Sequence, residues 1–303
     1  MRWGGFKEGG HVRVWITGGS GFIGRNLVDG LGNGFELLAP GHSALDLIDE
    51  DAVKRFMRRE QVDVVIHCAT KPGHRNAVDP TGLLYANTRM FFNIVRNERY
   101  FDRMILVTSG AVYDQRYYSP KMKESDFDRH VPIDDTGYSK YLCSKFASTR
   151  PNIVELRPFG VFGKYEDWEI RFISNAICKT LFDLPITIRQ NLLFDYIFVD
   201  DFVRIVRRFL EENLPMQAYN TTPNQSIELK TLAEKVLLAS GKDLPIKIAR
   251  EGMGREYSGD NSELKAIMPD LRFTPIDQAI ELLFQWYSER KDKINPDLLL
   301  FDK

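Results

Sequence analysis

Cysteines, long apolar runs and net charge are all scarce in this chain of 303 residues. Its three cysteines, Cys68, Cys143 and Cys178, are unclustered, so neither a disulfide framework nor a C-x-x-C zinc site is expected. No apolar run approaches the roughly 20 residues that span a bilayer, and residues 1–13 lack the apolar core of a signal peptide. The net charge of −1 gives no reason to expect nucleic acid as a partner. These absences predict a protein of the reducing cytoplasm that binds neither membrane nor nucleic acid.

The histidines and the overall composition point to an ordinary globular protein. No structural metal is expected, because the histidines show no metal-ligand spacing: His11, His42, His67, His74 and His130. Hydrophobic residues make up 43% of the chain and charged residues 27%, as is usual for a globular domain. The length allows one large domain or two modest ones.

Apolar stretches alternate with helical patterns over residues 12–212. Strands are expected at 12–16, 35–40, 62–70, 103–110, 152–158 and 192–199, and helices at 25–32, 49–61, 83–97, 139–149, 168–182 and 200–212. Nearly continuous apolar strands separated by helices predict a parallel sheet that is covered on both faces. The predicted fold is α/β, with a doubly wound (Rossmann) sheet in residues 1–160 and a smaller mixed substrate-binding lobe in residues 161–303. Residues 190–205 are expected to return to the core, with a strand near 194–199 joining its sheet.

A glycine-rich turn, "TGGSGFIG", lies between the first predicted strand and helix. Gly18 permits a tight turn, Gly21 lets a pyrophosphate approach the backbone, and Gly24 lets the helix pack against the strand. The start of the helix supplies amide donors for the phosphates. The pattern predicts dinucleotide binding; the ordinary alternative is a tight turn that binds nothing.

The identity of the dinucleotide depends on the end of the second strand. An NAD-binding chain carries an acidic residue about 20 residues after the glycine turn, but this chain has His42 and Ser43 there, with no carboxylate until Asp46. Because a carboxylate would repel a 2′-phosphate, its absence favours NADP(H), with NAD as the alternative. Asp46 and Leu47 are candidates for contact with the adenine.

The stretch "YSKYLCSK" holds two tyrosines, of which one has a lysine four residues later. Positions i and i+4 share a helix face, so Lys145 lies beside Tyr141, whereas Leu142 lies beside Tyr138. A nearby ammonium favours the phenolate, and such a tyrosine can exchange a proton with a substrate oxygen. The ordinary alternative is a polar helix with this spacing by chance.

Ordered motifs from residue 17 to about residue 201 resemble the extended short-chain dehydrogenase/reductase family, in particular its nucleotide-sugar epimerase/dehydratase branch. "TGGSGFIG" resembles T-G-x-x-G-F-I-G, "VTSGAVYD" resembles S-S-x-x-V-Y-G, and "YLCSK" matches Y-x-x-S-K. "VIHCAT" resembles the strand end that faces the cofactor, "LRPFGVFG" resembles L-R-x-x-N-V-Y-G, and "FDYIFVDD" resembles R-D-F-I-Y-V-D-D. The C-terminal third matches only loosely.

The resemblance implies roles for individual residues. Tyr141 is implied as the acid/base, Lys145 as the group that tunes it and binds the ribose, and Ser109 as the hydroxyl that polarises the substrate oxygen. Tyr138 is then a packing or substrate-facing residue. The cofactor is implied to contact Gly18, Gly21, Phe22, Ile23, Gly24, Cys68, Ala69, Thr70, Asn87, Thr108 and Pro158, besides Tyr141 and Lys145. Asn87 has an ordinary alternative as a capping or core amide.

Departures from the family motifs narrow the reaction. The 4,6-dehydratases have an Asp-Glu pair where this chain has Gly110 and Ala111, and the GDP-fucose synthases have a cysteine at Ala111 and a histidine near Arg171. What remains is NADPH-dependent reduction of a 4-keto nucleotide sugar, with Tyr141 as the proton donor. The alternatives are a 4-epimerase that retains NAD and a dinucleotide-binding sensor without turnover.

The remaining predictions concern the substrate and the assembly. A sugar nucleotide carries a diphosphate, so Arg171, Asn175, Lys179, Arg189 and Arg255 are candidates for binding it; any of the charged ones can instead be a solvated surface residue. Two helices carry more apolar residues than one sheet face needs: Phe91, Phe92, Ile94 and Val95 on one, and Tyr141, Leu142, Phe146 and Ala147 on the other. A homodimer through both helices is predicted, as the resemblance also implies. The alternative is that the rest of the same chain covers these side chains.

Overall fold

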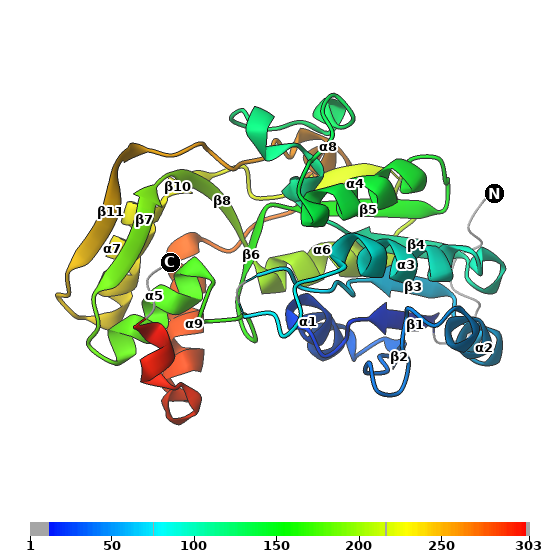
Figure 1. Ribbon diagram of the computed structural model, residues 1–303, viewed down its shortest axis with the longest axis horizontal. Coiled ribbons are helices and arrows are strands. Elements are labelled where there is room, and N and C mark those ends of the chain that lie inside the picture. The colour runs from blue at the N-terminus through cyan, green and yellow to red at the C-terminus, as the bar shows by residue number, and fades with distance from the viewer. Residues whose placement is uncertain (1–11, 75, 216, 301–303) are drawn as a thin grey trace.

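The computed structural model describes residues 12–74, 76–215 and 217–300. His11 and the glycine-rich stretch before it lie outside the described residues. The core consists of β1 (Val12–Thr17), α1 (Phe22–Leu31), β2 (Phe35–Leu38), α2 (Glu50–Glu60), β3 (Val64–His67), α3 (Leu83–Val95), β4 (Arg103–Val107), α4 (Asp135–Ala147) and β5 (Ile153–Pro158). These elements confirm the predicted alternation of strand and helix (Figure 1).

The central sheet has the strand order β2-β1-β3-β4-β5-β9, where β9 spans Ala218–Thr221, and the described pairings are all parallel. The chain runs from β1 outward to β2 and then crosses to β3 on the other side of β1. This reversal between β1 and β3 is the topological switch point, where parallel α/β sheets bind ligands at the carboxyl ends of their strands. The glycine turn follows β1 directly and therefore lies at this point.

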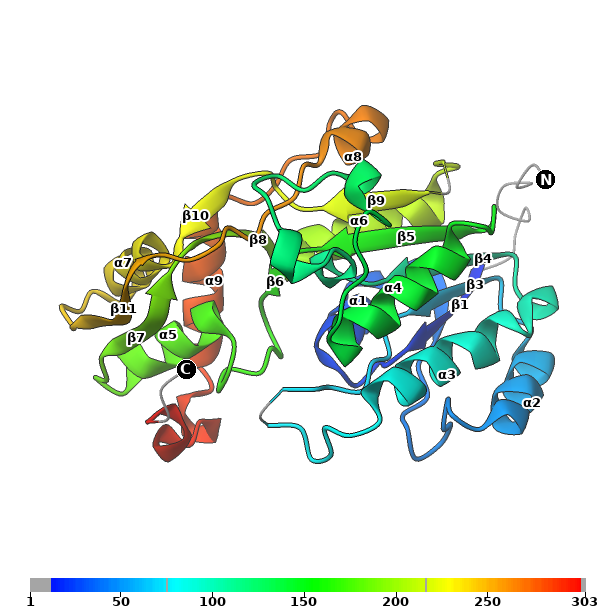
Figure 2. The ribbon, with the colours of Figure 1, turned by 45° about the horizontal axis from the view of Figure 1, so that its top comes forward.

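Helices cover both faces of the sheet, as the apolar strands predict. Along β1, Val14 and Ile16 pack with Leu27 of α1 and with α6 (Val199–Glu211), whereas Trp15 packs on the opposite face with α2 and α3. Helices α3 and α4 lie side by side on that second face (Figure 2). The α/β doubly wound class is confirmed.

The smaller lobe contains β6 (Gly160–Phe162), α5 (Phe172–Leu181), β7 (Ile186–Asn191), β8 (Leu193–Phe198), β10 (Ser226–Glu228), α7 (Leu229–Ser240), β11 (Ile246–Met253) and α9 (Ile276–Ser288). Its strands form a mixed sheet of order β10-β8-β6 and a pair β11-β7. Its own core lies between α5, α7 and α9. The prediction of a smaller mixed lobe is thus confirmed.

The predicted return of the chain to the core needs a correction. Strand β8 pairs with β6 and β10 and does not join the central sheet; β9 joins it, beside β5. Helix α6 packs on the core, and so do Leu264 of α8 (Ser262–Ile267) and Met268. The core is therefore assembled from three separate parts of the chain, and a single boundary at residue 160 does not divide it. None of the described helices is long and apolar enough to cross a membrane.

Candidate active site

The glycine turn has the tight geometry that the sequence predicts. Gly18 has a φ of +69°, a left-handed conformation, and the amide of Gly21 donates to its carbonyl at 2.9 Å. A Cβ on Gly18 would lie 2.9 Å from the backbone of Ala69, and one on Gly24 would lie 2.1 Å from the carbonyl oxygen of Gly18. The turn, the start of α1 and the end of β3 are therefore in close contact, which forms a cradle for a pyrophosphate.

A hydrogen-bonded network joins the ends of β1 and β3. The hydroxyl of Thr17 accepts from the amides of Cys68 and Ala69, each at 3.2 Å, and lies 2.9 Å from Nδ1 of His67. Burial, with a contribution from the charge of Lys140, lowers the pKa of His67 to about 4. Burial raises the pKa of the Cys68 thiol to about 12. Both groups are therefore neutral at pH 7.

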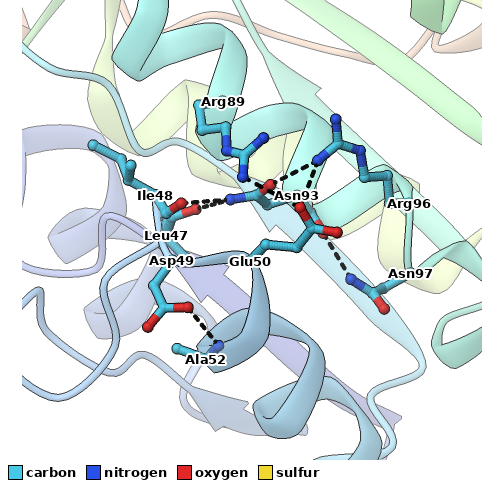
Figure 3. Close-up of polar contacts among 9 residues, drawn as sticks. All are labelled: Leu47, Ile48, Asp49, Glu50, Ala52, Arg89, Asn93, Arg96 and Asn97. Atoms are coloured by element: carbon cyan, nitrogen blue, oxygen red, sulfur yellow. Dashed lines mark hydrogen bonds and ion pairs between the residues drawn. The ribbon is translucent and has the colours of Figure 1, made fainter.

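The loop after β2 is fastened to α3 (Figure 3). The amide nitrogen of the buried Asn93 donates to the carbonyls of Leu47 and Ile48, both at 2.9 Å. Glu50 pairs with two arginines of α3, Arg89 and Arg96. The end of this loop, where α2 begins, is therefore held against α3.

Four residues of this loop were predicted to contact the adenosine half of the cofactor: His42, Ser43, Asp46 and Leu47. His42 and Asp46 are exposed, with 3.8 Å between Nδ1 of His42 and Oδ1 of Asp46, and Ser43 between them is also exposed. The side chain of Leu47 is buried in the core cluster that contains Trp15 and Phe56, so the predicted contact with adenine would fall to its backbone. Ala39, rather than residue 42, lies against the turn: its Cβ would be 2.7 Å from a Cβ on Gly19.

Ser109 follows β4 and begins a short 3-10 turn, whose Ala111 amide its hydroxyl caps at 3.2 Å. Thr108 is buried and donates to Glu155. Asn87 accepts from the amide of Lys71 at 2.6 Å and from the hydroxyl of Thr70 at 3.3 Å, so it positions the loop after β3. Pro158 ends β5, paired with Thr221.

Residues 17–24, 67–70 and 108–110 form the carboxyl-end rim of β1, β3 and β4, which we call the cofactor edge. The predicted cofactor residues Phe22, Ile23, Cys68 and Ala69 all lie on it. The structure thus brings most of the predicted cofactor residues together.

Both members of the predicted pair Tyr141–Lys145 bind one carboxylate, that of Asp128. The hydroxyl of Tyr141 donates to Asp128 at 2.5 Å, and Lys145 forms an ion pair with the same carboxylate. This hydrogen bond, together with burial, raises the pKa of Tyr141 to about 12, which is the opposite of what an acid/base tyrosine needs. Lys145 and Asp128 are both exposed. These contacts do not support the assignment of Tyr141 and Lys145 to catalysis and cofactor binding, which stays a prediction.

Another lysine of α4, Lys140, lies toward the cofactor edge. Its charge acts on His67 and Cys68 at the end of β3. At the start of the same helix, a Cβ on Gly137 would lie 2.9 Å from the carbonyl oxygen of Ala111, so the first turn of α4 packs against the segment that begins with Ser109. Sequence reasoning missed Lys140, although the dipeptide Ser-Lys occurs twice, at 139–140 and 144–145. Residues 136–140 read T-G-Y-S-K, so this stretch has Thr136 at the position where the Y-x-x-S-K pattern has a tyrosine.

Aromatic side chains close the site on the side of the smaller lobe. The Tyr257 hydroxyl would lie 2.7 Å from a Cβ on Gly110, and the Tyr118 hydroxyl donates to the carbonyl of Gly110 at 3.0 Å. The ring of Tyr257 is 4.9 Å from that of Phe159 and 4.8 Å from that of Phe194. These rings restrict the access of water to the Ser109 segment.

The predicted substrate residues have different surroundings. Arg171 precedes α5 and acts electrostatically on Lys140, Tyr196 and Tyr257, so it faces the site from the smaller lobe. Two other candidates are buried in the smaller lobe: Asn175 donates to the carbonyl of Trp168 at 3.1 Å, and Lys179 donates to Thr187. Arg189 is exposed on β7, and Arg255 donates to the carbonyl of Gln115. The predictions for Asn175 and Lys179 are corrected, because both are bound within the lobe.

A family model, the NAD dependent epimerase/dehydratase family, matches residues 14–221. A GDP-L-fucose synthase of Azorhizobium caulinodans is 35% identical over 133 residues, which cover 42% of this chain and 42% of the synthase. An ADP-L-glycero-D-manno-heptose-6-epimerase of Brachyspira hyodysenteriae is 24% identical and is matched over 88% of this chain and 95% of its own.

Solved structures share the fold over nearly the whole chain. A UDP-glucose 4-epimerase of Thermotoga maritima, with UDP-glucose, superposes with a TM-score of 0.79 and 19% identity, covering 93% of this chain and 100% of its own. A GDP-mannoheptose C4 reductase of Campylobacter jejuni, with NADP bound, superposes with a TM-score of 0.78 and 16% identity. The match covers 91% of this chain and 98% of the reductase chain. The chain belongs to the NAD-dependent epimerase/dehydratase family, and is an NAD(P)-dependent enzyme of the oxidoreductase or epimerase kind.

Proposed function

We propose that the protein reduces the 4-keto group of a nucleotide-activated sugar with NADPH. The observation that carries this proposal is the segment after β4. It offers one hydroxyl, that of Ser109, and continues with Gly110 and Ala111, which have no group that can move a proton at a sugar carbon. The hydrogen of Gly110 and the methyl of Ala111 cannot transfer the protons that dehydration or C3/C5 epimerisation requires. Reduction requires only a group that holds the carbonyl oxygen during hydride transfer, and the Ser109 hydroxyl is such a group.

The cofactor edge fits a dinucleotide. The close approach of Gly18 to Ala69 and of Gly24 to Gly18 packs the turn tightly, and Gly21, which has no side chain, lets a pyrophosphate approach its backbone. A bound NADPH supplies the hydride. The preference for NADPH over NADH is supported by Ala39, because the residue at the end of β2 that touches the turn has no carboxylate.

The nucleotide-sugar class is supported by the relatives and by the charge of the site. Two of the proteins that this chain resembles are a GDP-L-fucose synthase and a GDP-mannoheptose C4 reductase. Arg171 places a cation opposite Lys140, which suits the diphosphate of a sugar nucleotide. The proposed partner is thus a nucleotide sugar.

The test is an assay with purified protein, NADPH and the 4-keto-6-deoxy sugars of GDP, CDP, UDP and dTDP. Stoichiometric loss of NADPH with a C4 alcohol as product, seen by NMR, is the expected outcome. Interconversion of C4 epimers without net loss of cofactor would instead establish the 4-epimerase. Tight binding of NADPH without turnover of any sugar nucleotide would establish the sensor. Mass spectrometry of ligands that copurify with the protein identifies the base.

A further inference from the structure

An ion pair is buried between β5 and α4. Nη2 of Arg157 donates to Oε2 of Glu155 at 2.7 Å, and the two side chains are 2% and 4% exposed. Both residues lie on β5, on the same face of the sheet as Ile153, which packs with α4. A buried ion pair is weak evidence for a stabilising role, because the desolvation of two charges offsets their attraction. The contacts of the pair therefore say more about its role than its burial does.

Glu155 binds the residue that precedes Ser109. The hydroxyls of Thr108 and of Ser144, on α4, both donate to Oε1 of Glu155. An ionised carboxylate only accepts hydrogen bonds, so both hydroxyl protons point to it. Residues 109–112, which begin with Ser109, form the short 3-10 turn after β4, and we call them the Ser109 turn. Its first end is thus fixed to β5 and to α4.

Arg157 binds the residue that follows the Ser109 turn. Its Nη1 donates to the hydroxyl of Tyr113 at 3.1 Å, and this hydroxyl donates to Oδ1 of Asn220, on β9, at 2.8 Å. Nδ2 of Asn220 donates in turn to the carbonyls of Met122, at 2.9 Å, and Asp260, at 3.1 Å. The second end of the turn is thus fixed to the edge strand of the central sheet and to the segment before α8.

The turn between these two ends is short and closed by its own hydrogen bonds. The amide of Ala111 donates to the Ser109 hydroxyl at 3.2 Å, and the amide of Tyr113 donates to the carbonyl of Gly110 at 3.1 Å. The two fixed ends therefore determine where the Ser109 hydroxyl lies. A reacting geometry tolerates little error, since a misplacement of about 1 Å can cost about 10² in rate.

We propose that Glu155 and Arg157 are positioning residues, which hold the two ends of the Ser109 turn so that its hydroxyl meets the carbonyl oxygen during hydride transfer. This inference rests on the proposed ketoreduction. Neither residue reaches the substrate; both act through Ser109. The opposite charges suit the task, because the carboxylate accepts from Thr108 at one end of the turn and the guanidinium donates to Tyr113 at the other. Two apolar side chains could fill the same space but could hold neither end.

Turnover of matched variants tests the positioning role. Glu155→Gln keeps the shape of the side chain and removes its charge, and kcat should fall at least about tenfold, with the KM for NADPH within about twofold of the wild type. Asp201→Asn is the control, because Asp201 is also a buried carboxylate and accepts from the amide and hydroxyl of Thr274 on the opposite face of the sheet. Its kcat should stay within about twofold of the wild type. An unchanged kcat in Glu155→Gln would overturn the proposal.

A milder variant covers the case in which Glu155→Gln does not fold. Tyr113→Phe removes one hydroxyl from the network and no charge, so it leaves the ion pair in place. Its kcat should fall about threefold or more, as the loss of one hydrogen bond to a charged group allows. A Tyr113→Phe protein with the kcat of the wild type would show that the second end of the turn is not held through Arg157.

A double-mutant cycle with Ser109 separates positioning from general damage to the core. In a Ser109→Ala background there is no hydroxyl left to position, so Glu155→Gln should lower kcat by less than about twofold further. An equal loss in both backgrounds would mean that Glu155 acts through some other group, and would contradict the proposal.

Hydrogen exchange, which needs no substrate, keeps this inference separate from the proposed function. The amides of Ala111 and Tyr113 close the Ser109 turn. They should exchange at least about tenfold faster in Glu155→Gln than in Asp201→Asn, and faster in Tyr113→Phe than in the wild type. Unchanged exchange of these amides overturns the inference whatever the true substrate. A turn that loosens as expected, in a protein that reduces no 4-keto sugar, would refute the proposed function alone.

Discussion

Thr17 and His67 join the ends of β1 and β3 at the switch point of the sheet, with 2.9 Å between Oγ1 and Nδ1. The Thr17 hydroxyl already accepts two amide protons, so its own proton points to Nδ1, which must be unprotonated. The pKa of about 4 that burial gives His67 agrees with a neutral imidazole. The junction that supports the glycine turn therefore depends on an uncharged histidine.

This junction predicts a loss of stability in mild acid. In the unfolded chain, His67 binds a proton below about pH 6.5. In the folded chain, it stays neutral down to about pH 4. Proton binding therefore stabilises the unfolded state relative to the folded state as the pH falls through this window. The free energy of unfolding should drop by about 1.4 kcal/mol per pH unit from this residue alone. Urea unfolding at pH 7, 6 and 5 measures it.

Two variants isolate the contribution of His67. His67→Asn removes the titrating group and should flatten the slope of the unfolding free energy between pH 6.5 and 5, even if the variant is less stable overall. His42→Asn changes an exposed histidine and should leave the slope unchanged. Equal slopes in His67→Asn and the wild type would show that the imidazole is not the source.

The glycine turn predicts different effects for two left-handed glycines. Gly18→Ala adds a Cβ 2.9 Å from the backbone of Ala69, so the turn must shift and NADPH affinity should fall at least tenfold. Gly82, with a φ of +61°, has nothing within 4 Å of its Cβ position. Gly82→Ala should cost about 1–2 kcal/mol of stability from backbone strain and leave affinity unchanged. Fluorescence titration with NADPH and thermal unfolding compare them; equal affinities in both variants would argue against a pyrophosphate at the turn.

The residue at the end of β2 is expected to set the cofactor preference. The wild type should have a higher kcat/KM with NADPH than with NADH. Ala39→Asp places a carboxylate beside Gly19, where it repels a 2′-phosphate and accepts from a ribose hydroxyl. The ratio of the two values should shift toward NADH by at least about tenfold, or about 1.4 kcal/mol. Ala39→Asn, without the charge, should shift it less. A wild type that prefers NADH would contradict this argument and favour the epimerase.

The predicted homodimer now depends on a smaller apolar surface. Phe91, Ile94 and Val95 are buried within the chain, whereas Phe92, Leu142 and Phe146 stay partly exposed. The rings of Phe92 and Phe146 meet at 5.3 Å. Light scattering at micromolar concentration should give about twice the chain mass of 35.0 kDa. Phe92→Asp should shift the mass toward one chain with little loss of thermal stability. A wild-type mass near 35.0 kDa would mean that the chain is a monomer.

Local sequence determined the alternating core and its glycine turn. Strands such as "VRVWI" and "VDVVIH" are apolar at successive positions, and only a sheet covered on both faces buries both sides of such a strand. The turn was predictable because the positive φ of Gly18 and the missing Cβ of Gly24 are requirements that glycine alone meets without strain. These features depend on neighbours a few residues apart in the chain.

Tertiary packing decided which face of α4 meets the cofactor edge. The i, i+4 spacing pairs Tyr141 with Lys145 and Thr136 with Lys140 equally well, so the sequence could not choose between them. The choice depends on distant residues: Asp128 binds both Tyr141 and Lys145, whereas the charge of Lys140 acts on His67 and Cys68. The same holds for the choice between β8 and β9: the more apolar β8 pairs with β6 and β10, and the shorter β9 pairs with β5. The free energy of the whole packed core determines which face of a helix is buried and which strands pair. The spacing of residues along the chain does not determine either choice.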